Sequence, residues 1–233
     1  ALEADVRAMG PRFVDPEDRE SAALLATAKR AGFADRDLAA LSGMMEAAVR
    51  GARMALGLVP GYAMVDTCAA EFAAETPYFY STYAAAGSPP EAAPVARPAA
   101  LVIGSGPVRI GQGIEFDYCA VHAADVLRRE GWSAVMVNSN PETVSTDFDA
   151  STRLYFEPLD PESVRSIVEF ESGATEQHAA SAADMLPAVV AFGGQTPLNL
   201  AASLVAAGIP LLGSDLEAID HAEDRTRVST LLD

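Results

Sequence analysis

The sequence predicts an α/β protein in which a small all-helical domain precedes a doubly wound parallel sheet. Three observations lead to this prediction. Apolar residues recur with helical spacing through residues 1–59, a proline-rich run occupies residues 87–98, and short apolar runs alternate with amphipathic stretches after residue 98. Strand and helix in alternation are typical of a parallel sheet that carries helices on both faces. We therefore expect two packed domains joined by a linker.

The helical domain is expected over residues 1–86. Three of its segments have the periodicity of a helix and end at or near a glycine, which commonly follows the last turn. They are residues 21–31, ending at Gly32, residues 35–41, ending near Gly43, and residues 45–56, ending at Gly57. The pattern indicates short helices joined by tight turns.

The linker is expected over residues 87–98. The run GSPPEAAPVARP contains four prolines and has no apolar periodicity. Proline restricts the backbone and removes a hydrogen-bond donor, so such a run favours an extended chain on the surface. We expect this linker to be mobile and open to proteases.

The α/β domain is expected over residues 99–215, as a five-stranded parallel sheet with intervening helices. The predicted strands are residues 99–103, 134–137, 154–156, 188–192 and 209–212, and the predicted helices are residues 116–130, 161–170 and 198–207. Residues 171–185 interrupt the alternation and are expected to form a surface insertion. In sheets of this kind, ligands bind in the loops after the carboxyl ends of the strands.

Composition disfavours several classes of function. The chain of 233 residues has 33 acidic and 16 basic residues, a formal charge of −17, which argues against nucleic acid or a membrane surface as a partner. No run of 18 apolar residues is present, and we expect no signal peptide. Cys68 and Cys119 are far apart and have no neighbouring metal ligands, so no metal site is predicted, and a cytoplasmic location is expected.

The first predicted strand is followed by a glycine-rich loop. Its candidate ligand-binding residues are Gly104, Gly106, Arg109, Gly111, Gln112 and Gly113. A dinucleotide fingerprint would need glycine at position 109 and an acidic residue at position 138, where Asn138 stands. A phosphate-binding P-loop would need lysine at position 112. The loop can instead line a ligand site or a passage, or it can be a tight structural turn, and both interpretations stay open.

Two further loops hold polar residues at equivalent positions. The second loop contributes Asn138, Asn140, Glu142 and Thr143, and the third contributes Gly193, Gly194, Gln195 and Thr196. Short polar side chains also stabilise irregular loops, and threonine is a common helix cap, so a structural role is an alternative for both loops. Glu115 is a further candidate, although a carboxylate beside a helix start is usually stabilised by the dipole. We assign no catalytic residue.

Several motifs in this region together resemble one family. They are GSGPVRIGQGIEFDYCAVHAADVLR, VNSNPETVSTDFD, RLYFEPL, FGGQTPLNLA and AIDHAEDR. In this order they are similar to the opening of the second, carbamate-phosphorylating half of carbamoyl phosphate synthetase large subunits. Upstream, AKRAGFADRDLA and VDTCAAEFAAETPYFYSTY resemble the family's helical oligomerisation domain. Ala63 and Met64 stand where the family usually has basic residues.

The resemblance implies a fold and a function. Residues 99–215 would be a Rossmann-like pre-ATP-grasp domain, and residues 216–233 would begin an ATP-grasp domain that this sequence does not complete. The whole subunit would be an ATP-dependent, glutamine-hydrolysing ligase of arginine and pyrimidine biosynthesis, which makes carbamoyl phosphate from bicarbonate, glutamine-derived ammonia and two ATP, with Mg²⁺. This piece would bind no ATP or Mg²⁺ itself and would be inactive alone.

The implied partners are the glutaminase small subunit, other copies of the large subunit, and the rest of the large subunit. The helical domain would supply an assembly surface, and the candidate loop residues would bind substrate or line a tunnel. Two alternatives belong to other functional classes. One is the dinucleotide-binding domain of a dehydrogenase, against which Asn138 argues, and the other is a free-standing assembly module.

Overall fold

The computed structural model describes residues 1–73, 75–83, 91–107, 109–111, 113–173, 184–224 and 227–229. The described chain divides into two compact units. One comprises residues 1–63 with 81–83, and the other comprises residues 64–80 with the residues from 91 onward. The predicted domain bounds at residues 86, 98 and 215 stay a prediction.

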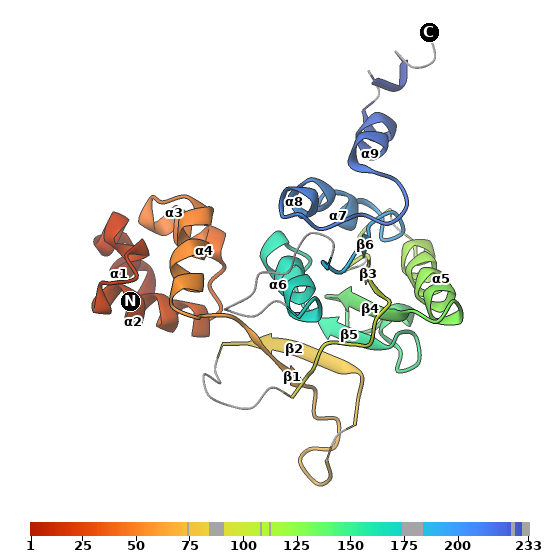
Figure 1. The fold of residues 1–233 in the computed structure, drawn as a ribbon, viewed down its shortest axis with the longest axis horizontal. Helices are drawn as coiled ribbons and strands as arrows, with labels where there is room; N and C mark the ends of the chain where they lie inside the picture. Colours follow the sequence, from red (N-terminus) through yellow and green to blue (C-terminus); the bar gives the residue numbers. More distant parts are fainter. Residues whose placement is uncertain are drawn as a thin grey trace. The chain divides into compact units, whose positions relative to one another are not determined.

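The first unit is mainly helical (Figure 1). Its helices are α1 (Leu2–Met9), the 3-10 helix η1 (Gly10–Val14), α2 (Arg19–Arg30), α3 (Asp35–Ser42) and α4 (Glu46–Ala55). Buried apolar side chains from all of them form one core: Val6, Phe13, Leu25, Leu38 and Val49. The three helices predicted from periodicity are present as α2, α3 and α4. Asp35 also joins these three helices, because its carboxylate lies 2.9 Å from Lys29 Nζ and 3.0 Å from Arg53 Nε, with all three side chains buried.

The second unit is an α/β layer structure, as predicted. After residue 98 its elements are β3 (Ala99–Ile103), α5 (Glu115–Arg129), β4 (Ser133–Asn138), the 3-10 helix η2 (Val144–Thr146), β5 (Arg153–Phe156), α6 (Pro161–Glu171), β6 (Ala188–Val189), α7 (Gln195–Leu198), α8 (Ala201–Ala206) and α9 (Leu216–Glu223). Figure 1 shows α5 on one side of the sheet and α6 and α8 on the other.

The sheet is mixed and mostly parallel. Its strand order is β1-β2-β5-β4-β3-β6, where β1 spans Gly61–Met64 and β2 spans Tyr78–Thr82. Every pairing from β2 to β6 is parallel. β3 pairs with β4 from Ala99 opposite Ser133 to Ile103 opposite Val137. The carboxyl ends of β3, β4 and β5 therefore meet at one edge.

The centre of the sheet is buried on both faces. All five residues of β3 are buried, which explains why a continuous apolar run predicted this strand. On the α5 side, Val102 and Met136 pack against Ala120 and Ala124. The alanines let the helix approach the strands closely, so the start of α5 is fixed beside the edge where the loops lie.

The prediction of a five-stranded sheet from residues 99–212 is wrong: the described part of this range contributes four strands, β3 to β6, and β1 and β2 extend the sheet from the earlier part of the chain. Tyr78 and Phe79 pair with Leu154 and Tyr155 of β5. Buried Phe79 beside exposed Tyr80 is the alternation of a strand, but the partner strand is too distant in sequence for local pattern reasoning to identify.

Three smaller predictions also need correction. The strand expected at residues 188–192 has only two residues, and residues 209–212 contribute an isolated bridge between Ala188 and Leu211. The helix expected at residues 198–207 is split into α7 and α8. α7 begins at Gln195 with Gly194 as its N-cap, so Thr196 and Pro197 lie inside the first turn and the helix begins earlier than expected.

The described part of the predicted linker is anchored, whereas we expected it to be mobile. Val95 N donates to Glu171 Oε2 at 2.7 Å, and Ala93 O accepts from Arg153 Nη1 at 2.7 Å. Upstream, Glu91 Oε2 accepts from Met64 N at 2.7 Å. Residues 87–90 of the linker, and residues 174–183 of the predicted insertion, lie outside the described residues. Within the described residues, no helix is long and apolar enough to cross a membrane.

Candidate ligand-binding site at the carboxyl edge of the sheet

The loops after β3 and β4 are joined by one buried side chain, that of Asn138. Its Oδ1 accepts hydrogen bonds from Gly106 N at 3.1 Å and from Asn140 N at 3.2 Å. Its Nδ2 donates to Ser145 Oγ at 2.9 Å and to Asp117 Oδ1 at 3.5 Å. A neutral amide has two acceptor positions and two donor hydrogens, so Asn138 uses its full capacity inside the protein.

A residue of α5 also stabilises the second loop. Asp117, in the first turn of α5, accepts a hydrogen bond from Ser145 N at 2.9 Å. A carboxylate at this position is also stabilised by the positive end of the helix dipole. Thr143 and Thr146 form a reciprocal capping box around η2. These contacts fix the conformation of the loop.

Glycine is required where the first and third loops meet. A Cβ atom on Gly193 would lie 2.6 Å from Ile103 O and 2.8 Å from Gly104 O, both backbone atoms that cannot move independently. A Cβ on Gly104 would lie 2.7 Å from the side chain of Asn138. Gly106 has a φ of 72°, a conformation that favours glycine. These glycines allow close packing of the loops.

The loops line an open cavity of about 640 Å³ at the carboxyl edge of the sheet. It is lined by Pro107, Arg109, Ser139, Pro141, Phe156, Glu157, Pro158, Leu159 and Thr196. The carboxylate of Glu157 belongs to a buried residue, whereas Arg109 is exposed. Thr196 Oγ1 is buried and has no hydrogen-bond partner within the described part of the chain. The position agrees with the general location of ligand sites in open α/β sheets.

The structure divides the predicted site residues into three groups. Arg109 and Thr196 line the cavity. Six others do not line the cavity but pack or form hydrogen bonds within the surrounding loops: Gly104, Gly106, Asn138, Asn140, Thr143 and Gly193. Gly111, Gly113, Glu115, Glu142, Gly194 and Gln195 are not among its lining residues. Gln112 lies outside the described residues.

Two of the residues away from the cavity have identifiable contacts. Gln195 Nε2 donates to Asn199 Oδ1 at 3.2 Å and to Glu223 Oε2 at 3.1 Å, and so joins α7 to α9. Glu142 N donates to Asn140 Oδ1, which forms a turn within the second loop.

Sequence reasoning missed the segment after β5. Phe156, Glu157, Pro158 and Leu159 line the cavity, although the motif RLYFEPL drew attention to this segment without any of its residues being predicted as a site. The signal that could have found them is position, since a loop at the end of a third parallel strand must reach the same edge.

The described lining of the cavity carries one arginine, two hydroxyl groups and one carboxylate, that of buried Glu157. Arg109 offers a positive charge, and Ser139 and Thr196 offer hydroxyl groups. None of its lining residues is a histidine, lysine or cysteine. Among the described residues, no group of three or more His, Cys, Asp or Glu side chains is arranged to hold a metal ion.

Comparison with known proteins decides the family. Residues 96–221 match the model of the carbamoyl phosphate synthase preATP-grasp domain. The chain belongs to the carbamoyl phosphate synthase large-chain family. This confirms the resemblance found in the motifs.

Relatives in this family extend the match to the helical unit. The carbamoyl phosphate synthase large chain of Thermomicrobium roseum is 57% identical over 227 residues, which cover 95% of this chain and 20% of the relative. The large chains of Arthrobacter sp. and Streptomyces coelicolor are 51% and 54% identical over 94% and 90% of this chain, and over 19% and 18% of their own lengths. The chain therefore spans about a fifth of the length of these carbamoyl phosphate synthase large chains.

Proposed function

We propose that the chain is a segment of a carbamoyl phosphate synthase large chain whose cavity edge forms part of the wall of the carbamate-phosphorylating site. The whole enzyme would make carbamoyl phosphate from bicarbonate, glutamine-derived ammonia and two ATP. The observation that carries this proposal is the convergence of the loops after β3, β4 and β5 and before α7 around one cavity. Family membership supports it, because residues 96–221 match the preATP-grasp domain.

In this proposal Arg109 attracts an anionic substrate or intermediate, and Thr196 Oγ1 supplies a hydrogen bond from the opposite loop. An arginine and a hydroxyl are a suitable pair for a small oxyanion. The close packing at Gly104 and Gly193 keeps the loops narrow, so that a small intermediate can pass along the edge without meeting large side chains.

ATP and Mg²⁺ would be bound by other parts of the large chain. We propose that this segment alone is inactive. Phosphate transfer then depends on residues outside this chain, and the cavity edge contributes positioning and exclusion of water.

The proposed partners are the glutaminase small subunit, other copies of the large chain, and the remainder of the large chain, in the cytoplasm. The helical unit would supply an assembly surface. Its separate core and exposed apolar side chains, Met45 and Met54, support this role.

Substitution of Arg109 in the full-length large chain tests the proposal. Arg109→Ala should reduce carbamoyl phosphate synthesis by about tenfold to a hundredfold, because a charged contact to a substrate is lost. Arg129→Ala is the matched control, since Arg129 is an exposed residue at the far end of α5 that pairs with Asp125. Steady-state synthesis rates with saturating ammonia give the comparison. Equal rates for Arg109→Ala and Arg129→Ala would remove the cavity from the reaction.

A further inference from the structure

The loop between β1 and β2, residues 65–77, exposes a large aromatic side chain. Phe72 is 76% exposed, more than the other large aromatic residues that the structure describes. In Figure 1 this loop extends away from the sheet, below β1 and β2. The loop makes no contribution to the cavity described above, whose lining residues begin at Pro107.

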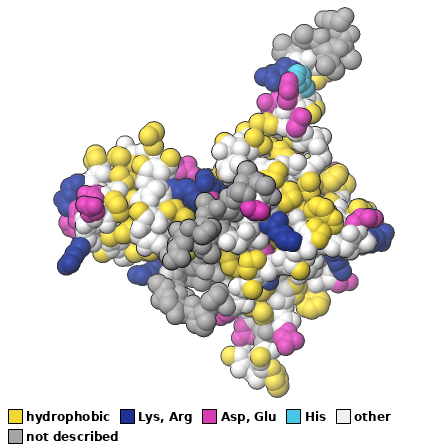
Figure 2. Space-filling model, in the orientation of Figure 1, with side chains coloured by type: hydrophobic (Ala, Val, Ile, Leu, Met, Phe, Trp, Pro, Cys, Tyr) yellow, Lys and Arg dark blue, Asp and Glu magenta, His cyan; other side chains and the backbone are white. Residues whose placement is uncertain are grey.

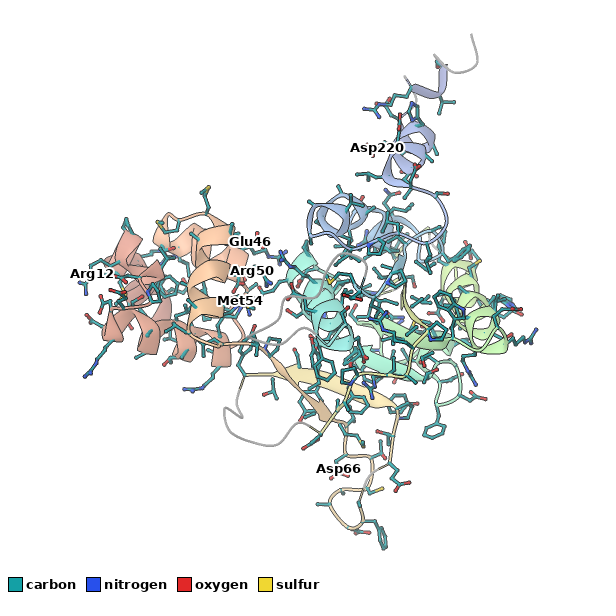
Figure 3. All side chains as sticks on the ribbon, in the orientation of Figure 1. Arg12, Glu46, Arg50, Met54, Asp66 and Asp220 are labelled. Carbon is teal, nitrogen blue, oxygen red and sulfur yellow. The ribbon has the colours of Figure 1, made fainter. Side chains whose placement is uncertain are left out.

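Residues 66–70 of this loop have a defined conformation. Asp66 Oδ1 accepts from Cys68 N at 2.8 Å, and its Oδ2 accepts from Ala70 N at 2.7 Å. Figure 3 labels Asp66 at the base of the loop. Ala69 and Ala70 have φ values of 50° and 59°, in the left-handed region that alanine rarely adopts. The fold thus holds a strained backbone and an exposed phenyl ring, neither of which favours folding of this unit by itself.

Charge on the loop restricts what can cover Phe72. Exposed Glu71 precedes it and exposed Glu75 follows it, and the sequence has no lysine or arginine between Arg53 and Arg97. Figure 2 shows hydrophobic and acidic side chains on the protruding loop. A complementary surface would combine an apolar pocket for the ring with a basic rim for the carboxylates.

The size of the loop favours a partner within the same polypeptide. A stable contact between separate proteins buries about 800 Å² on each partner, which is more than one short loop provides. Inside one chain the effective concentration reaches about millimolar, so a small contact is sufficient. Because this chain spans about a fifth of the length of its relatives, most of such a large chain lies outside it.

We propose that Phe72 anchors an intramolecular docking contact, in which its ring enters an apolar, basic-rimmed pocket on the part of the large chain outside residues 1–233. Aromatic residues on preorganised loops are frequent anchors of interfaces, because little conformational entropy is lost on docking. The inference rests on family membership and is independent of the role proposed for the cavity.

Photo-crosslinking in the full-length large chain with its small subunit tests this contact. Benzoylphenylalanine at position 72 should form a product with the mass of a single large chain, joined to a peptide outside residues 1–233 that contains lysine or arginine. The same probe at Val205, an exposed residue of α8, should not capture that peptide. A product with the mass of two large chains, a product with the small subunit, or no protein product would each overturn the proposal.

Hydrogen exchange provides a second measurement that does not depend on the probe. In the full-length chain, Phe72→Ala should increase exchange of the amides in residues 68–72 by about tenfold, because the contact that protects them is lost. Exchange in β3 and β4 should remain at the wild-type rate, which shows that the fold is intact. Identical exchange of residues 68–72 in both proteins would contradict docking.

Discussion

Two buried polar networks hold irregular backbone in the α/β unit, and they differ in the side chain at their centre and in what they hold. Asn138 is neutral and uses both donors and acceptors to connect the loops after β3 and β4. Glu171 is a carboxylate that accepts from Arg153 Nη1 at 2.7 Å, Tyr155 Oη at 2.5 Å and Val95 N at 2.7 Å. The first network shapes a cavity, whereas the second anchors the segment before β3.

The difference follows from hydrogen-bonding chemistry. An amide can join several backbone groups of a loop without an unpaired charge, so it suits a cavity wall that must leave room for a ligand. A buried carboxylate requires hydrogen-bond donors and a nearby cation, which Tyr155 and Arg153 provide for Glu171. Burial, together with the negative charge of Glu171, raises the pKa of the Tyr155 phenol above its ordinary value. The Glu171 network contains a buried ion pair, so removal of one partner leaves the other charge buried and unpaired, at a large cost in stability.

The largest effect on stability should come from the charged network. Glu171→Ala leaves Arg153 largely buried without its carboxylate and should lower the free energy of unfolding by about 3–5 kcal/mol. Glu169→Ala on the same helix is the matched control, because its pair with Arg165 is a partly exposed i,i+4 contact worth about 0.5 kcal/mol. Urea unfolding of both variants measures the difference, and similar losses would show that Glu171 is not a buried anchor.

A smaller difference in stability is expected between substitutions of two glycines in the predicted ligand-binding loops, Gly193 and Gly113. Gly193→Ala places a methyl group against the backbone oxygens of Ile103 and Gly104 and should cost about 1–3 kcal/mol. Gly113→Ala should change stability by less than about 1 kcal/mol, because φ at Gly113 is not positive and the nearest atoms belong to the flexible end of Glu115. Thermal unfolding of both variants gives the order, and a reversed order would contradict the loop packing described.

The fold was largely predictable after residue 98, where apolar runs mark strands that are buried on both faces. The strands β3, β4 and β5 and the helices α5 and α6 lie within a residue or two of their predicted positions. Strands β1 and β2 were missed because their recognition depends on pairing with β5, a distant contact that periodicity does not encode.

The cavity was predictable only in outline. Arg109 and Thr196, which were selected by loop position, line the cavity, and their role in binding stays a prediction. Spacing does not reveal in which direction a side chain points. Asn138 was predicted to bind a ligand or stabilise its loop, and it supports the second interpretation because all its hydrogen-bonding capacity is used internally. Phe156 was missed because nothing in its composition distinguishes a cavity wall from an ordinary core residue.

Under the proposed function, the Asn138 network maintains a cavity used in the reaction, while the Glu171 network has only a structural role. The most direct test compares carbamoyl phosphate synthesis by two variants of the full-length large chain, Asn138→Ala and Glu171→Gln, at a temperature where both remain folded. Asn138→Ala should lose about tenfold to a hundredfold in rate, because small displacements of reacting groups have effects of this size. Glu171→Gln should retain a rate close to that of the wild type. Wild-type synthesis by Asn138→Ala, or equal losses in both variants, would contradict the account.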